Sequence, residues 1–475
     1  MRRDPGPLTD RHLVAVALGS LLGAGVLYVP DHVENLAGPA TPLAYVAATA
    51  AACALAAAYA VFLSSPLAET DGGAYLFLSR TWHSRPVGFL LVWPAVGAYV
   101  ALLALLASAL GGVLAAVVSP LSATGGGLFV IAGVVGVHAL GPAAVGRAQL
   151  GLTGLLAAAL LAFVVVAATA VNLSNFVPLL PTPSLRDAPV ASLSAATTVS
   201  LFGFVGFDVV VTAAGAARDP RRSGPRALFV GVGGAGVLSA AAAFVAFGVV
   251  PWWQLLYARA PFADAAASAL GVDVARLLGP GTVLATASAL LALTWAPSRL
   301  LAGLDELLPS LARRNRFGAP DLSLGLVGVA AGGVVLADGL AYALYLSVAG
   351  LAVQYVGVAA TAAALPVVRP ALYERCRVRP RPAVLALVGV VGVVVAGALL
   401  RQTLTVDPGF VLRWTRWSPA LSSAPIDRLP SDPARSVLPA LLVWETLGVA
   451  AFAVAADYRE AAGVDLPAIA AAYEE

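Results

Sequence analysis

Residues 201–208, Leu-Phe-Gly-Phe-Val-Gly-Phe-Asp, lie within an apolar segment that runs from about Ser192 to Ala217. A segment of this length can cross a bilayer as a helix, which needs about 20 apolar residues. However, Gly203 and Gly206 stand at its centre, and Asp208 follows them. Gly costs roughly 1 kcal/mol relative to Ala inside a helix, and an ionised Asp is expensive at membrane depth. A helix that is broken beside a polar cavity accommodates both features, so the segment predicts a broken span rather than a plain lipid anchor.

A second glycine-rich stretch lies near the start of the chain, at residues 19–25, Gly-Ser-Leu-Leu-Gly-Ala-Gly. Glycine-interrupted spans at corresponding places in two halves of a chain are typical of the binding sites of secondary transporters. If the two stretches belong to spans one and six, they are the first members of two five-span repeats. An unwound turn at residues 19–25 would expose backbone N–H and C=O groups to a cavity. The alternative is close helix packing, because Gly19 and Gly23 also have the small-xxx-small spacing.

Composition places the chain among polytopic membrane proteins. Apolar residues make up 60% of the 475 residues and charged residues 11%, and the mean hydropathy is +0.89. Soluble proteins carry about 25% charged residues. All 28 basic residues are arginine, so the membrane interior has no lysine whose ammonium could lose its proton.

Nothing in the sequence predicts catalysis or a bound cofactor. The two cysteines and four histidines lack the spacing of a metal site, and neither an HExxH motif nor a P-loop is present. We therefore expect no enzyme activity, no metal, no cofactor, no nucleic-acid partner and no use of ATP by this chain. The expected partners are a small-molecule substrate and the lipid bilayer.

Runs of about 20 apolar residues predict an all-α polytopic membrane protein with about twelve transmembrane helices. The spans lie at about 12–35, 42–64, 86–118, 125–141, 147–171, 192–217, 227–250, 281–304, 322–337, 340–366, 383–400 and 437–456. We expect one membrane transport domain over residues 1–475. Its first five-helix repeat covers about 12–171, a second, inverted repeat covers about 192–366, and two C-terminal helices cover about 383–456.

Arginine placement predicts the orientation of these spans, because cytoplasmic loops are enriched in positive charge. With the N-terminus inside, the inside loops contain most of the arginines, among them Arg80, Arg147, Arg221 and Arg377. The loop at 401–436 is an exception that contains five arginines. We expect a multi-pass protein of the cytoplasmic (inner) membrane with both termini cytoplasmic.

Asp208 and Phe202 are the strongest candidates for functional side chains in the broken sixth span. Asp208 could bind a cation, hold a proton or pair within the bundle, and Phe202 could close over a substrate as a gate. The alternative is that Asp208 is a structural hydrogen-bond partner and Phe202 an ordinary core residue. Other polar residues within spans, each more typical of helix–helix contacts than of ligand binding, are Ser20, Tyr99, Ser108, Thr294, Trp295, Ser298, Arg299, Gln354 and Tyr355.

The order and spacing of these motifs resemble the amino acid–polyamine–organocation (APC) superfamily of permeases. Residues 19–27 are similar to its glycine-rich first-span motif, and Gly-Gly-Ala-Tyr at 72–75 is similar to the beginning of its third span. Residues 138–149 resemble its junction between spans four and five, although Asn is usual where this chain has His at 138. The most specific match is 202–208 with 217–226, which resembles the broken sixth span and the basic loop after it.

This resemblance implies a LeuT-like fold with broken helices 1 and 6, and secondary active transport of amino acids or related amines by alternating access. It places the substrate α-carboxylate at the backbone of 20–25 and the α-amino group near the carbonyls of 202–205, with Phe202 as the gate. The substrate-binding residues that it implies are Ser20, Gly23, Ala24, Gly25, Phe202, Gly203, Phe204 and Val205.

The chain departs from the family pattern at the residues that would couple transport to an ion. Some proton-coupled relatives have a lysine in span five, where this chain has Leu156. Asp208 occupies a position that is often Glu in relatives, so it is the candidate for a coupling proton or cation. An exchanger that needs no coupling ion, a polyamine carrier, and a non-transporting sensor or partner subunit remain alternatives.

Overall fold

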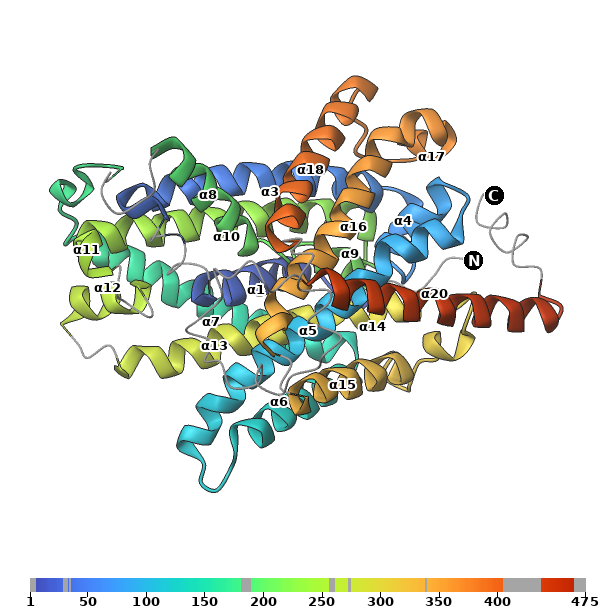
Figure 1. The fold of residues 1–475 in the computed structure, drawn as a ribbon, viewed down its shortest axis with the longest axis horizontal. Coiled ribbons are helices and arrows are strands. Elements are labelled where there is room, and N and C mark those ends of the chain that lie inside the picture. Colours follow the sequence, from blue (N-terminus) through green and yellow to red (C-terminus); the bar gives the residue numbers. More distant parts are fainter. Residues whose placement is uncertain are drawn as a thin grey trace.

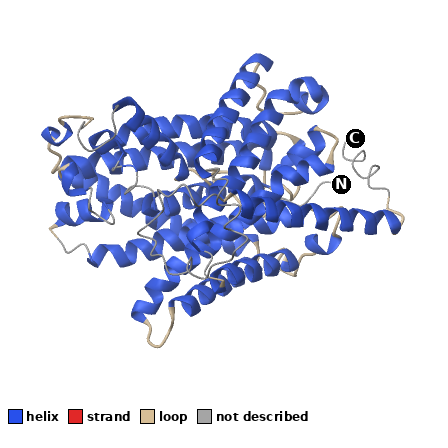
Figure 2. Cartoon of the chain, viewed as in Figure 1, coloured by secondary structure: helices blue, strands red, loops and turns tan. Residues whose placement is uncertain are grey.

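The computed structural model describes residues 6–28, 33, 36–180, 189–255, 261–271, 275–337, 340–404 and 437–464. Within these ranges every regular element is a helix, and Figure 2 shows the helices joined by loops without a strand. The long loop predicted at 401–436 lies outside the described residues, apart from its first four positions.

Helices occupy all of the predicted spans. The long helices are α1 (Asp10–Tyr28), α3 (Thr41–Leu63), α5 (Arg85–Val117), α6 (Ala123–Ala139), α7 (Pro142–Ala168), α8 (Pro189–Phe202), α10 (Pro220–Val249), α13 (Ala275–Leu293), α15 (Asp321–Leu336), α16 (Leu340–Val368), α18 (Pro382–Thr403) and α20 (Leu438–Ala461). The shorter helices are α4 (Ala74–Thr81), α9 (Val209–Ala214), α11 (Trp252–Leu255), α12 (Pro261–Leu270), α14 (Trp295–Ala302) and α17 (Pro370–Glu374).

Two of the predicted spans are each made of two helices, since α8 and α9 form the sixth and α13 and α14 form the eighth. Among the described residues, eight helical segments are long and apolar enough to cross a membrane. The prediction of an all-α polytopic membrane protein is therefore confirmed. The division into two inverted repeats stays a prediction.

Proline and glycine set the limits of several spans. Proline lies in the first turn of α3, α5, α7, α10 and α18, where its missing N–H costs no helical hydrogen bond. Gly141 has a φ of +87° between α6 and α7, a left-handed conformation that favours glycine. The chain therefore turns sharply there and enters α7 at once.

Helix α1 lies inside the bundle. It packs against α7, α9, α10 and α13, and Figure 1 shows it between α10 and α13. Around this centre, α16 packs against α5 and α18, while α3 packs against α8 and α10. Large apolar side chains such as Phe129, Val165 and Val329 are exposed on the outside of the bundle, as a lipid-facing surface requires.

The sixth span is broken where the sequence predicts it. Helix α8 ends at Phe202, α9 begins at Val209, and residues 203–208 form turns between them. Gly206 has a φ of +96°, and its N–H donates to the hydroxyl of Tyr355 at 3.0 Å instead of to a helical carbonyl. A residue with a Cβ is strained in this conformation, so glycine permits the break.

The first span is not broken where the sequence predicts it, because α1 is continuous through Gly19–Gly25. The glycines instead allow neighbouring helices to approach. A Cβ on Gly19 would lie 2.5 Å from Thr153 Oγ1, and one on Gly23 would lie 2.5 Å from the Cβ of Ala289. The alternative interpretation, close packing of small residues, therefore holds for these two positions, and it keeps the helical hydrogen bonds intact.

The loops that the arginine pattern assigns to the cytoplasmic side lie together at one end of the bundle. Leu8 N–H donates to the Ala216 carbonyl at 3.1 Å, which joins the N-terminal segment to the residues after α9. Arg221 donates to the carbonyls of Ser64 and Arg375. Three of the predicted cytoplasmic loops thus contact one another, and we call this the arginine-rich end.

Candidate functional site

Asp208 lies at the end of the break in the sixth span and is 3% exposed. Its Oδ1 accepts hydrogen bonds from Tyr99 Oη on α5 at 2.7 Å and from Tyr355 Oη on α16 at 2.8 Å. Its Oδ2 accepts from Gln354 Nε2 on α16 at 2.8 Å. Helices α5 and α16 therefore hold the carboxylate of the broken span.

A second layer of aromatic groups surrounds this carboxylate. Tyr59 on α3 accepts a hydrogen bond from Gln354 Nε2 at 3.0 Å. The ring of Phe207 lies 5.3 Å from that of Tyr59 and 4.9 Å from that of Tyr355, measured between centroids. Tyr59, Phe207 and Tyr355 are each at most 1% exposed. We call Tyr59, Tyr99, Asp208, Gln354 and Tyr355 the Asp208 network.

The Asp208 network stabilises a carboxylate without a fixed counter-ion. A charged group buried in an apolar interior is costly unless it is hydrogen-bonded or paired. In the described part of the chain, no arginine forms an ion pair with Asp208, and all of its side-chain donors are neutral. A group held in this way can take up a proton or a cation without first breaking an ion pair.

The break also frees backbone carbonyls. The N–H groups of Gly203, Phe204 and Val205 donate three residues back, to Ser200, Leu201 and Phe202. Among the described residues, no backbone N–H donates to the carbonyl of Gly203 or Val205. These two carbonyls are acceptors of the kind that bind an ammonium group.

The predicted substrate-binding residues fall into two groups. Phe202, Gly203, Phe204 and Val205 lie at the break; Phe204 and Val205 are buried, whereas Phe202 is half-buried. Ser20 and Gly23 lie on the buried side of α1, where Ser20 Oγ donates to the Ala17 carbonyl of its own helix at 2.9 Å.

Ala24 and Gly25 belong to the same continuous helix, and their side-chain surroundings lie outside the described part of the chain. Helix α1 packs on α9, the helix that follows the break. The structure therefore brings the first and sixth spans together, as the prediction requires.

A neutral polar cluster joins α1, α7 and α13. Gln149 Nε2 lies 2.8 Å from Thr153 Oγ1 and 3.1 Å from Ser288 Oγ. Thr153 Oγ1 donates to the Ala15 carbonyl at 3.0 Å. We call these residues the Gln149 cluster, and it lies directly beside Gly19.

The polar residues of the eighth span serve its kink between α13 and α14. Thr294 and Ser298 donate to carbonyls one turn back in the same span, at 2.8 and 3.0 Å. The ring nitrogen of His138 on α6 contacts the Leu291 carbonyl at 2.9 Å. The ring centroid of Trp295 lies 5.5 Å from that of His138 and 5.3 Å from the guanidinium carbon of Arg299. These residues stabilise the kink and do not belong to the Asp208 network.

Buried ion pairs close the arginine-rich end of the bundle. Arg299 on α14 is 3% exposed and pairs with Asp71 at 3.1 Å, and Arg314 also pairs with Asp71. Glu306 is 5% exposed and pairs with Arg80 and Arg85. The loop before α4 is thereby bound to the end of the eighth span.

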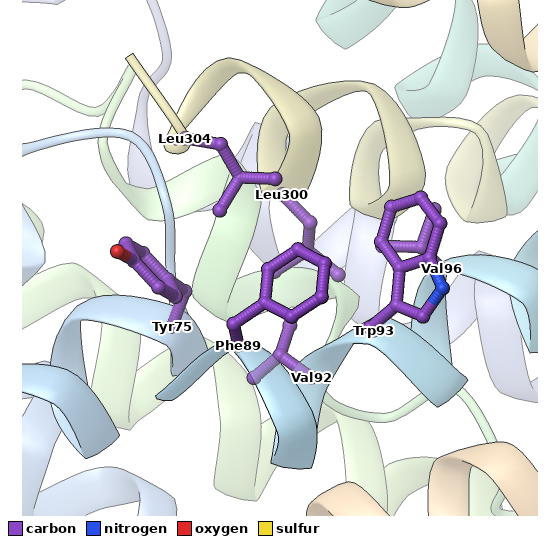
Figure 3. Close-up of a pocket in the computed structure, with 7 residues that line it drawn as sticks. All are labelled: Tyr75, Phe89, Val92, Trp93, Val96, Leu300 and Leu304. Carbon is purple, nitrogen blue, oxygen red and sulfur yellow. The ribbon is translucent and has the colours of Figure 1, made fainter. Parts of the chain in front are cut away.

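A cavity near these ion pairs is too small for a substrate. Figure 3 shows it between Tyr75, Phe89, Trp93 and Leu304, with the remaining lining residues also apolar. Its volume is about 10 Å³, which is room for about one water molecule. None of its lining residues belongs to the Asp208 network, so we interpret it as a packing gap.

Sequence reasoning missed two of the residues that matter here. Tyr59 is one of two tyrosines in an alanine-rich span, and a tyrosine at membrane depth is the sequence signal that points to it. Glu306 follows the eighth span, and its partners lie more than 200 positions earlier in the chain. No local spacing points to such a pair.

The fold and the site define a multi-pass α-helical membrane protein whose sixth span is broken beside a buried carboxylate, and discontinuous helices of this kind occur in many transporter folds. The amino acid permease family matches residues 11–415. The chain belongs to this family, and the predicted resemblance is confirmed. It is a membrane permease of the amino acid transport class and not an enzyme.

Three relatives show how far the likeness extends. The chain is 26% identical over 340 residues to the branched-chain amino acid permease BcaP of Lactococcus lactis, covering 66% of this chain and 72% of the relative. It is 27% identical over 336 residues to the chloroplastic cationic amino acid transporter 9 of Arabidopsis thaliana, covering 64% and 56%. It is 27% identical over 350 residues to the methylthioribose transporter of Bacillus subtilis, covering 68% and 73%.

Proposed function

We propose that this chain is a secondary active transporter that moves an amino acid or a related amine by alternating access, with a proton on Asp208 as the coupling ion. The observation that carries the proposal is the break in the sixth span. The carboxylate of Asp208, at the end of this break, accepts hydrogen bonds from neutral donors on α5 and α16, and no arginine of the described chain pairs with it. A proton on Asp208 would weaken these bonds and so change how tightly the broken span is held.

The break supports a site for the substrate amino group. The free carbonyls of Gly203 and Val205 would accept hydrogen bonds from the substrate ammonium, and half-buried Phe202 would cover it. For the α-carboxylate we propose the backbone of 20–25 on α1. Because α1 is continuous there, its N–H groups become available only if the helix opens when substrate binds.

The arginine-rich end supports an orientation. Cytoplasmic loops carry the excess of positive charge in membrane proteins, and arginines of the predicted cytoplasmic loops that the structure describes make contacts between those loops at one end. We propose that this end faces the cytoplasm, with both termini on that side of a cytoplasmic membrane.

The test is uptake by purified protein in liposomes. A panel of labelled amino acids and polyamines is offered with and without an inward proton gradient, and with or without unlabelled substrate inside. Uptake driven by the gradient alone, and lost in Asp208→Asn, is the expected result. Uptake that requires internal substrate and ignores the gradient would identify an exchanger. Absence of uptake of every panel member by folded protein would favour a sensor or a partner subunit.

A matched pair of variants tests the substrate site. Gly203→Leu adds a bulky side chain beside the free carbonyls and is expected to abolish binding while the protein still inserts and folds. Gly154→Leu is the control, because a Cβ at Gly154 meets nothing within 4 Å. Normal substrate affinity in Gly203→Leu would contradict the assignment.

A further inference from the structure

The side-chain amide of Gln354 lies between Asp208 and Tyr59. When Asp208 gains a proton, the hydrogen bonds that these two groups can make with the amide change. Its Nε2 is 2.8 Å from Asp208 Oδ2 and 3.0 Å from Tyr59 Oη. The residue is 1% exposed, and its Oε1 has no hydrogen-bond partner among the described residues. The NH₂ group of the amide thus donates both of its hydrogens, whereas the carbonyl oxygen accepts no hydrogen bond from the described residues.

With Asp208 ionised, the observed orientation of the amide fits. A carboxylate only accepts hydrogen bonds, and Tyr99, Tyr355 and the amide N–H all donate to it. The second N–H of the Gln354 amide donates to the hydroxyl oxygen of Tyr59. The proton of the Tyr59 hydroxyl then has no acceptor recorded in the described part of the chain.

With Asp208 protonated, the same orientation fails. Oδ1 already accepts from two tyrosine hydroxyls, so the proton belongs on Oδ2, which faces Gln354 Nε2. An O–H and an N–H would then point at each other. A half-turn of the amide removes this conflict, because it places Oε1 where Nε2 was, and the two atoms are nearly equal in size.

After the half-turn, both neighbours find an acceptor. Oε1 would accept the proton of Asp208 Oδ2 and the hydroxyl proton of Tyr59, at the heavy-atom positions already present. The idle position would then hold the NH₂ group instead of the oxygen. Asp208 and Tyr59 therefore keep hydrogen-bond partners in either protonation state, with weaker bonds when Asp208 is neutral, and α3, α9 and α16 need not move.

Among the described residues, no other charged group bonds to Asp208. The helices packed against α9 are α1, α3, α10, α14 and the short 3-10 helix Pro66–Glu69. Their charged residues near α9 have other partners: Arg299 pairs with Asp71, and Asp10 pairs with Arg226. Outside the Asp208 network, the remaining charged or titratable residues of these helices whose side chains the structure describes form no recorded bond to Asp208. They are Arg11, His12, Tyr45, Cys53, Glu69, Arg221 and Arg222.

We propose that Gln354 is a positioning residue that stabilises both protonation states of Asp208 by a half-turn of its amide. The proposal rests on the proposed function, in which Asp208 is the proton site, and deepens it. Gln354 would let the proton load and unload while the broken span stays in register with α5 and α16.

The first test is the pH profile of uptake in liposomes for the wild type and Gln354→Leu. A hydrogen bond to a carboxylate is worth about twice one between neutral groups. Loss of the amide therefore weakens the ionised state more than the protonated state and raises the proton affinity of Asp208 roughly fivefold to tenfold. The midpoint of proton-dependent uptake should move up by about one pH unit.

The control is Gln149→Leu, which removes a second fully buried amide that bonds to other spans. It should lower uptake or stability without moving the midpoint. If Gln354→Leu, like the control, lowers uptake by one constant factor across all pH values and leaves the midpoint unchanged, Gln354 has only a structural role and the proposal is overturned. Gln354→Met is measured alongside, so that a fold defect specific to leucine cannot decide the outcome.

The second test reads the amide directly and does not depend on transport. The chain has four glutamines, so infrared spectra of protein labelled with ¹³C at the glutamine side-chain carbonyl can be assigned by the band lost in Gln354→Leu. This band should shift on acidification in the wild type and stay fixed in Asp208→Asn. A carboxylic acid band from Asp208 without a shift of the Gln354 band would overturn the role of Gln354 alone. No Asp208 band and no proton-dependent uptake would overturn both proposals.

Discussion

Gly19 is the position at which one added methyl group should have the largest structural effect. A Cβ there would lie 2.5 Å from Thr153 Oγ1 and 2.8 Å from Ser288 Oγ, and closer still to Gln149 Nε2. All of these neighbours are fully buried, so they cannot turn away into solvent. Gly19→Ala must therefore either separate α1 from α7 and α13 or break the Gln149 cluster.

The magnitude follows from the two terms involved. Overpacking a dense core by one methyl group costs about 1–3 kcal/mol. The cluster adds hydrogen bonds from Gln149 to Thr153 and Ser288 and from Thr153 to Ala15, and a hydrogen bond between membrane helices averages about 0.6 kcal/mol. The two costs total about 3–5 kcal/mol. Ala gains roughly 1 kcal/mol over Gly in a helix, so we expect Gly19→Ala to destabilise the fold by about 2–4 kcal/mol at most.

The assay is thermal or denaturant unfolding of the purified protein in detergent. The matched control is Gly154→Ala on α7, where a Cβ meets nothing within 4 Å and which should be neutral or slightly stabilising. A double variant of Gly19→Ala with Gln149→Ala should recover part of the loss, because the cycle isolates the clash between the two residues. Equal stability of Gly19→Ala and Gly154→Ala would refute the packing assigned to α1.

Three further predictions follow from other sites. Gly206→Ala should destabilise the fold by about 1–2 kcal/mol, because its φ is +96°; unchanged unfolding would show that the turn can relax. Arg299→Gln should cost about 3–5 kcal/mol by leaving Asp71 short of a buried partner, and Arg299→Gln with Asp71→Asn should lose less than the single variant. Burial raises the pKa of the Cys376 thiol to about 11, so in Cys53→Ala protein maleimide labelling should be slow at neutral pH and accelerate up to about pH 11; rapid labelling at neutral pH would show that the thiol is accessible and acidic.

The positions of the spans could be predicted from the sequence because they depend on local composition. A run of about 20 apolar residues is a helix in a membrane, since no other spanning structure satisfies its own backbone apart from a closed barrel. The break in the sixth span could be predicted for a similar reason. Gly203, Gly206 and Asp208 are all unfavourable in a continuous lipid-facing helix, and the structure separates α8 from α9 at these residues.

The same reasoning was wrong for the first span, although its glycines look alike in sequence. A glycine inside a span either lets the helix break or lets another helix approach, and the choice depends on the neighbours. Around Gly19 and Gly23 the neighbours are residues of α7 and α13, and they fill the space that an opened turn would need. The glycines of α1 therefore serve packing, and the helix keeps its backbone hydrogen bonds.

By itself, the sequence determined that this chain is a helical membrane permease with a carboxylate at a broken sixth span. It also marked Tyr99, Gln354 and Tyr355 as polar residues within spans, but without connecting them. Only the tertiary structure decided that they meet at Asp208, from positions 109, 146 and 147 residues away in the chain. The physical reason is that the spacing of residues determines the face of a single helix, whereas contacts between helices depend on their crossing and register, which no local pattern encodes.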